Sequence, residues 1–128
     1  TPKWSSLGWA GARLDDVLAF IPARLSAGLL ILTGLLLSRN WKQAMRQTAT
    51  QARQMKSPNA GWPMAAAAWI MEGTMGGWTE YHGQRTFKPI LGPTDMEWTE
   101  DKLTSLLTLI HISGWSLALA GFIILFFL

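Results

Sequence analysis

Residues 57–64 read Ser-Pro-Asn-Ala-Gly-Trp-Pro-Met, and this stretch is the best-defined turn of the chain. Two prolines and a glycine exclude a regular helix or strand, because proline fixes φ and removes a donor while Gly61 frees its own φ. Ser57 and Asn59 are expected to bond the local backbone, and Trp62 adds an amphipathic ring. Pro63 suits the first position of a helix over 65–68. The stretch therefore predicts a rigid polar loop at a helix N-terminus, a place that attracts anions.

Two long apolar segments, residues 17–37 and 103–128, lie on either side of this loop. As helices they would measure about 31 and 39 Å, against about 30 Å for the hydrocarbon core of a bilayer. A buried helix of a soluble bundle is the alternative, and the unbroken apolar run over 122–128 argues against it because that run has no polar face. We therefore predict two transmembrane helices.

The cations that follow the first apolar segment indicate its orientation. They are Arg39, Lys42, Arg46, Arg53 and Lys56. By the positive-inside rule, residues 38–102 form a cytoplasmic loop region of a multi-pass membrane protein. The predicted fold is an all-α polytopic membrane protein, a single unit over 1–128, with amphipathic and short re-entrant or interfacial helices between the two spans.

Composition sets further limits. With 49% hydrophobic residues the chain can bury one modest core, and without cysteine it has neither disulfides nor a thiolate metal site. The chain opens without Met and without a signal-peptide pattern. We expect it to be the carboxy-terminal part of a longer protein, whose amino-terminal part is then a partner.

The segments between these landmarks give coarser predictions. Residues 1–11 suggest an irregular interfacial approach, and Pro22 should kink a helix or start one. Residues 41–56 form an amphipathic helix, with Asn40 and Gln43 as a capping box. Its cationic flank suits either anionic lipid or a polyanionic substrate.

The second half of the predicted loop region is less regular. Residues 63–72 predict a short helix whose alanines allow close packing, and Gly73 should end it. Residues 78–93 suggest turns and short extended pieces. A capping box over 94–97 should open the helix that continues into the last apolar segment.

The candidate chemistry begins with a charged cluster at the start of the first apolar segment. Arg13, Asp15, Asp16 and Arg24 border the predicted membrane span. A solvated first turn of a helix is the alternative for the acidic pair, but Arg24 at the edge of the hydrocarbon needs snorkelling or an acidic partner. P-loop, dinucleotide, HExxH and Gly-x-Ser-x-Gly motifs are absent. Carboxylates with cations suit Mg²⁺ and phosphate better than covalent catalysis.

Three motifs in order carry a resemblance: ARLDDVLAFIPARL at 12–25, SPNAGWPMAAAA at 57–68, and Tyr81 and Gly83 with KPILG at 88–92. Together they resemble the CbiB/CobD family of cobalamin biosynthesis, the membrane-bound adenosylcobinamide-phosphate synthase. The chain departs from that pattern at Ala19, where the family commonly has Asn, and at Lys88, where it commonly has Arg. Lysine keeps the charge but loses the bidentate fork.

The resemblance implies an ATP-dependent amide ligase that joins adenosylcobyric acid to aminopropanol or its phosphate. It implies Mg²⁺ on Asp15 and Asp16, and phosphate or carboxylate on Arg13 and Arg24. Substrate positioning would fall to the loop and to the stretch that follows it, at Ser57, Asn59, Gly61, Trp62, Tyr81 and Lys88. ATP would be the co-substrate, the surrounding membrane lipid is an expected partner, and no nucleic-acid partner is expected.

Two other classes stay open. A non-catalytic membrane sensor is one of them, because a related family linked to β-lactamase regulation resembles the region from Asp15 to Leu25 but usually lacks SPNAGWPM. A soluble helical interaction domain is the other, and it would extract without detergent.

Overall fold

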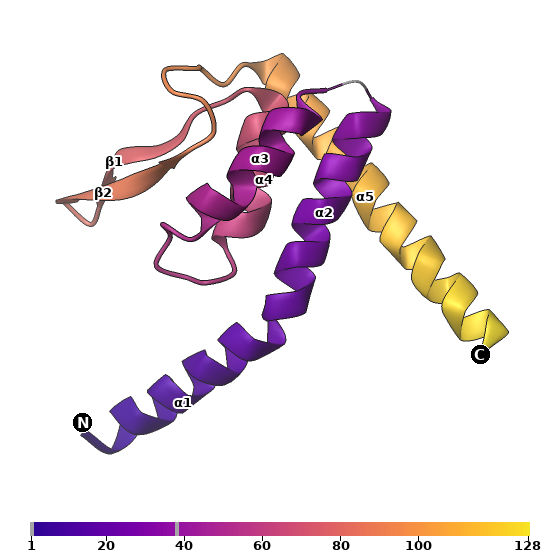
Figure 1. Ribbon diagram of the computed structural model, residues 1–128. Helices are drawn as coiled ribbons and strands as arrows, with labels where there is room; N and C mark the ends of the chain where they lie inside the picture. Colours follow the sequence, from indigo (N-terminus) through magenta and orange to yellow (C-terminus); the bar gives the residue numbers. More distant parts are fainter. Residues whose placement is uncertain (1, 38) are drawn as a thin grey trace.

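The computed structural model describes residues 2–37 and 39–128, so Thr1 and Ser38, at the ends of two predicted segments, lie outside it. It contains five helices and two strands in this part of the chain (Figure 1). In order they are α1 (Pro2–Leu18), α2 (Phe20–Leu36), α3 (Trp41–Ala52), α4 (Gly61–Met71), β1 (Met75–Tyr81), β2 (Gln84–Leu91) and α5 (Glu100–Phe127).

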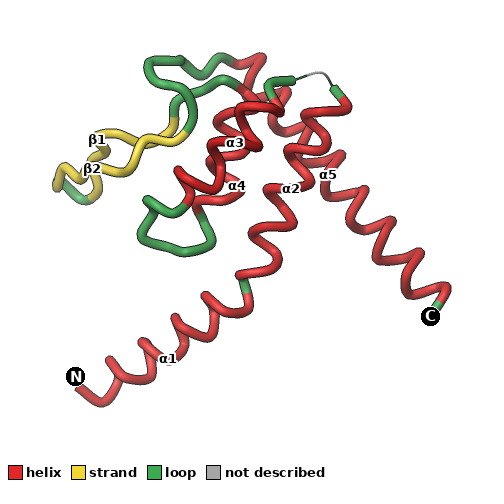
Figure 2. The backbone as a smooth tube through the Cα atoms, viewed as in Figure 1, coloured by secondary structure: helices red, strands yellow, loops and turns green. Residues whose placement is uncertain are grey.

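The chain bends between α1 and α2 at Ala19, which Figure 2 shows as a break between two helical segments. Pro22 explains the bend, because it has no N–H to donate to the carbonyl of Leu18 and its ring crowds that carbonyl. The predicted kink is thus confirmed. The irregular approach predicted for residues 1–11 is wrong over its described part, since α1 is helical from Pro2. Pro2 suits a first helical position, and after it nothing stronger than Gly8 and Gly11 interrupts the helix.

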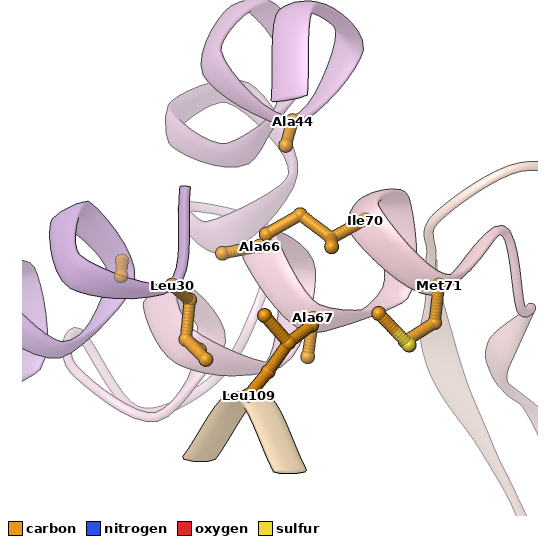
Figure 3. Packing of buried hydrophobic residues seen from close by; sticks show 8 residues of the cluster. Leu30, Ala44, Ala66, Ala67, Ile70, Met71 and Leu109 are labelled. Carbon is orange, nitrogen blue, oxygen red and sulfur yellow. The ribbon is translucent and has the colours of Figure 1, made fainter. Parts of the chain in front are cut away.

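Helices α3 and α4 form a hairpin that folds back along α2. The hydrogen bond from Arg39 N to Gly34 O turns the chain, and α4 then runs parallel to α2, with Asn59 beside Asp16 at one end and Ile70 beside Gly34 at the other. Close approach depends on small residues, as predicted: the four alanines over 65–68 are all buried. The core lies where α2, α3, α4 and the first half of α5 meet (Figure 3).

The predicted bounds of α3 and α4 need correction. Helix α3 ends at Ala52 rather than at 56, and Asn40 occupies its N-cap without a side-chain cap bond. Helix α4 begins at Gly61, so Pro63 is its third residue, where a missing N–H costs nothing because the first four donors have no intrahelical acceptor. It ends at Met71 with Glu72, not Gly73, in the left-handed conformation (φ 53°).

Strands β1 and β2 form an antiparallel hairpin, so the all-α prediction is wrong for residues 75–91. The two-residue turn uses His82 and Gly83, both with positive φ (50° and 77°), as a tight hairpin requires. Trp78 and Phe87 pair across the strands with ring centroids 5.4 Å apart. A β-bulge lies in β2, where Pro89 and Ile90 are opposite Gly76 alone. Pro89 and Gly76, which suggested loops, therefore belong to the bulge and to the residue that faces it.

Helix α5 begins at Glu100, so the capping box predicted over 94–97 is wrong. Thr99 Oγ1 caps the helix by accepting from Lys102 N at 3.3 Å. Residues before it are held non-helical by Thr74, whose oxygens accept from Met96 N (2.8 Å) and from Trp98 Nε1 (2.9 Å).

Two helical stretches, Gly8–Leu36 and Glu100–Phe127, are long and apolar enough to cross a membrane. They meet at a buried hydrogen bond of 3.0 Å between the hydroxyls of Thr33 and Ser113. Beyond Ser113 the helices diverge, and α5 is exposed from Gly114 onward (Figure 1).

Candidate functional site

The loop between α3 and α4 is ordered by its own side chains. Ser57 Oγ accepts from the backbone N–H groups of Asn59 (3.4 Å) and Ala60 (3.3 Å), as predicted for its local bonding. Gly61 is buried against the end of α3, and a Cβ there would lie 2.6 Å from the carbonyl oxygen of Ala52. Glycine therefore lets the first turn of α4 touch the last turn of α3.

Asn59 connects this loop to the bend between α1 and α2. The sequence suggested that its side chain bonds the local backbone, and this is wrong. The side chain instead contacts the motif over 12–25. Nδ2 donates to the backbone oxygen of Asp16 at 2.7 Å, and Oδ1 accepts from Arg24 Nη1 at 3.2 Å. The residue is only 5% exposed. The amide orientation follows from chemistry, because a carbonyl can only accept and a guanidinium can only donate.

Arg24 is held between two aromatic rings. Its guanidinium carbon lies 3.4 Å from the ring centroid of Phe20 and 4.6 Å from that of Trp62. Nη1 also donates to Phe20 O at 2.8 Å. Both hydrogen bonds to described residues thus come from Nη1. Nε and Nη2 are left for a ligand, in a planar fork suited to phosphate or carboxylate.

The backbone of Asp16 lies beside this group, since its carbonyl oxygen accepts from Asn59. Asp16 is half-buried and Asp15 is exposed. Consecutive helical residues point about 100° apart, so the two carboxylates diverge. No group of three His, Cys, Asp or Glu side chains lies together in the part of the chain that the structure describes. Two diverging carboxylates do not fit an all-protein metal cage, but a single one of them suits Mg²⁺ bound mainly by waters and substrate phosphates.

Three other predicted site residues lie away from the Asn59 contacts. Arg13 is exposed and stacks 5.5 Å from the ring of Trp9, on α1. Tyr81 and Lys88 face each other on the β-hairpin, with Lys88 Nζ donating to the Tyr81 hydroxyl at 3.1 Å and lying 4.4 Å from the ring centroid. That hairpin projects away from α2 and α5 (Figure 1). The structure therefore brings together Asp16, Arg24, Asn59 and Trp62.

Sequence reasoning missed Gln51, which joins α3 to α4 and to the end of β2. Its Oε1 accepts from Trp69 Nε1 (2.8 Å) and from Gly92 N (2.7 Å), while Nε2 donates to Gly92 O (3.3 Å). Its signal was its position on the inner face of the amphipathic helix, between Thr48 and Ala52, where a polar side chain needs partners.

A pocket that sequence reasoning also missed adjoins Arg24. It has a volume of about 420 Å³, and Arg53, Met55 and Lys56 line it together with Arg24 and the two aromatic rings. The sequence groups Arg53 and Lys56 with Arg39, just after the first apolar segment. In the structure, α3 runs back along α2, so Arg53 and Lys56 lie beside Arg24 at the amino-terminal end of α2.

Comparison with known proteins identifies the family. The profile described as CobD/Cbib protein matches residues 1–110. The Cobalamin biosynthesis protein CobD of Klebsiella pneumoniae is 38% identical over 121 residues, covering 94% of this chain and 38% of that protein. The proteins of the same name from Chromobacterium violaceum (46%) and Stutzerimonas stutzeri (43%) match over 90 residues each, 70% of this chain and 27% and 28% of theirs.

The chain thus spans less than two fifths of the curated relatives it matches. No solved structure gives a significant match. The match of the family profile extends from the first residue through every predicted site residue and into the first half of α5. The chain belongs to the CobD/Cbib family of cobalamin biosynthesis proteins.

Proposed function

We propose that this chain is part of an ATP-dependent amide ligase that joins adenosylcobyric acid to aminopropanol or aminopropanol phosphate. Membership of the CobD/Cbib family supports the pathway, because its relatives are named for cobalamin biosynthesis. The single observation that supports a reaction site is the Asn59 amide, which bonds both the backbone carbonyl of Asp16, 43 residues away in sequence, and the guanidinium of Arg24, 35 residues away.

The chemistry required of such a ligase matches the side chains present. A carboxylate resists attack by an amine until one of its oxygens becomes a leaving group. Transfer of the γ-phosphoryl group from ATP gives an acyl phosphate and ADP; attack by the amine then forms the amide, releases phosphate and frees one proton. The fork of Arg24 suits the charge on the transferring phosphoryl group or on the carboxylate.

Asp16, with Asp15 beside it, would hold Mg²⁺ together with water and substrate phosphates. The ion would supply neutralisation of phosphate charge. Trp62 presents a ring next to Arg24, and we assign it to substrate contact. Substrate contact by Ser57, Asn59, Gly61, Tyr81 and Lys88, and a phosphate role for Arg13, stay predictions.

The test is amide formation by the full-length protein in detergent, with ATP, Mg²⁺, adenosylcobyric acid and each amino alcohol in turn. Asp16→Asn should lower the rate at least about 100-fold, since even the outer-shell partners of a metal site contribute about 10–100-fold. Asp101→Asn, an equal change at an exposed residue of α5, is the matched control and should keep the parent rate. Full activity of Asp16→Asn would remove Asp16 from the metal role.

We also propose that the protein resides in the bacterial inner membrane with the loop over 57–64 open to the cytoplasm. The two apolar helical stretches support a membrane location. The need for ATP supports the cytoplasmic side.

A further inference from the structure

The pocket beside Arg24 has an unusual balance of charge. Its lining contains three cations, Arg24, Arg53 and Lys56, and among the described residues no carboxylate. Like charges gathered around one cavity repel one another, and an anion in the cavity relieves that repulsion. The charge alone therefore favours an anionic occupant.

The walls of the pocket distinguish it from a plain basic surface. Phe20, Met55 and Trp62 line it, so the cations border a partly apolar cavity of about 420 Å³. That volume lies within the range of small-molecule sites. Arg24 is fixed by two hydrogen bonds and two aromatic rings, with Nε and Nη2 left for a ligand. One preorganised guanidinium with two exposed cations is a pattern suited to phosphate.

We infer that Arg53 and Lys56, together with Arg24, form a phosphate-binding pocket. The group bound is a phosphate anion, carried either by a soluble organic phosphate or by a lipid headgroup. The identification of a soluble phosphate with a substrate of the amide ligase rests on the proposed function; the presence of the phosphate site does not.

The structure offers a matched pair of variants on one segment. Arg53→Gln with Lys56→Gln removes two charges from the pocket. Lys42→Gln with Arg46→Gln removes two charges from exposed positions of α3 outside the pocket lining. All four side chains are exposed, so neither double variant should disturb the core, and equal thermal unfolding midpoints would check this.

Binding is measured on the full-length protein in nanodiscs of neutral lipid, by calorimetric titration with ATP and separately with aminopropanol phosphate. The pocket variant should lose at least about tenfold in affinity for one of these probes, as expected for lost charge-assisted hydrogen bonds. The control variant should match the parent. This result assigns the site to a soluble phosphate.

A second arm tests the lipid source. The protein is purified from mixed phosphatidylcholine and phosphatidylglycerol, and the retained lipid is measured. Loss of phosphatidylglycerol by the pocket variant alone, with unchanged titrations, assigns the site to a headgroup. Equal behaviour of the two double variants in both arms overturns the inference.

Amide formation measured in parallel separates this inference from the proposed function. If the pocket variant forms the amide as fast as the parent and also binds both probes and lipid as the parent does, the phosphate pocket is refuted and the ligase is not. If the parent forms no amide but the pocket variant still loses phosphate binding, the ligase is refuted and the phosphate pocket is kept.

Discussion

Asn59 uses both ends of its amide on the protein itself, which gives it a structural role alongside any contact with substrate. The residue is buried, and its two partners belong to the bend between α1 and α2. Arg24 can lie between Phe20 and Trp62 because Asn59 fixes its Nη1. The loop over 57–64 thus shapes the site by orienting a guanidinium carried by another helix.

Asn59→Asp should test this role with almost no change in shape. The new carboxylate keeps an acceptor for Arg24 but places an oxygen where Nδ2 now donates to Asp16 O at 2.7 Å. Losing that donor beside a carbonyl should lower the free energy of unfolding by about 1–3 kcal/mol. Asn40→Asp is the control, since Asn40 makes no side-chain cap bond and Asp is equally suited to an N-cap. Equal thermal unfolding midpoints for the two variants would contradict the role.

Gly92, the last residue of KPILG, is required where the hairpin docks on α4. Its φ is +84°, and a Cβ would lie 2.7 Å from both Ala68 Cβ and Gly73 O. Gly83 has a similar φ of +77° but open space around it, so an alanine there measures the cost of the positive φ without any steric clash. Gly83→Ala should cost about 1 kcal/mol, and Gly92→Ala about 1–3 kcal/mol more. Chemical unfolding of both variants measures the difference, and a Gly92→Ala no worse than Gly83→Ala would exclude close packing.

At the scale of elements, helix α2 meets α5 through one buried polar contact, between the hydroxyls of Thr33 and Ser113. Thr33 also donates to Leu29 O, so it keeps a partner when Ser113 is replaced. Ser113→Ala should therefore cost only the interhelical bond, about 0.5–1 kcal/mol in a membrane protein. Unfolding in mixed detergent micelles measures it. Ser116→Ala, which removes an exposed hydroxyl bonded within α5, should have no effect; equal losses would show that the contact does not hold the helices together.

Four of the five described helices could be predicted from the sequence because each carries its own signal, whereas the first turns of α1 were predicted to be irregular. Apolar length marks α2 and α5, periodicity marks α3, and the run of alanines marks α4. The β-hairpin was missed because its glycines and Pro89 also typify loops, and only pairing with the opposite strand shows the bulge that they build. Strand pairing is a non-local property.

The candidate site was predictable only as a set of motifs. Local patterns suggested the acidic pair and the loop, while the resemblance placed them in one site. No local pattern indicates that Asn59 reaches the carbonyl of Asp16, because a backbone acceptor 43 residues away leaves no mark in composition or spacing. The positions of Arg53 and Lys56 were missed for a related reason. Their location depends on α3 turning back along α2, and the sequence alone does not give that direction.

For the whole molecule, the folding back of α3 decides where the site lies relative to a membrane. The loop over 57–64 follows α2 in sequence, yet it contacts Asp16 near the end of α1 and Arg24 in the first turn and a half of α2. Helix α3 has 12 residues, or about 18 Å, which is short of the about 30 Å of a hydrocarbon core. The α3–α4 hairpin therefore cannot carry the loop from one aqueous face to the other. If α2 crosses the membrane, the loop lies part of the way through the hydrocarbon core, and its polar residues then require protein or water around them.

This length argument predicts that the loop and the start of α5 open to the same side of the membrane. The chain has no cysteine, so single cysteines can be introduced at Ala60 in the loop and at Glu97 before α5, within a cysteine-free full-length protein. Both positions are exposed and should react with a membrane-impermeant maleimide in inside-out vesicles but not in right-side-out cells. Leu119→Cys, on the exposed apolar part of α5, should resist the reagent from both sides. Labelling of the Ala60 position only from the side opposite to Glu97 would mean that α2 crosses the bilayer with the site at its far end, and would refute a loop that opens to the cytoplasm.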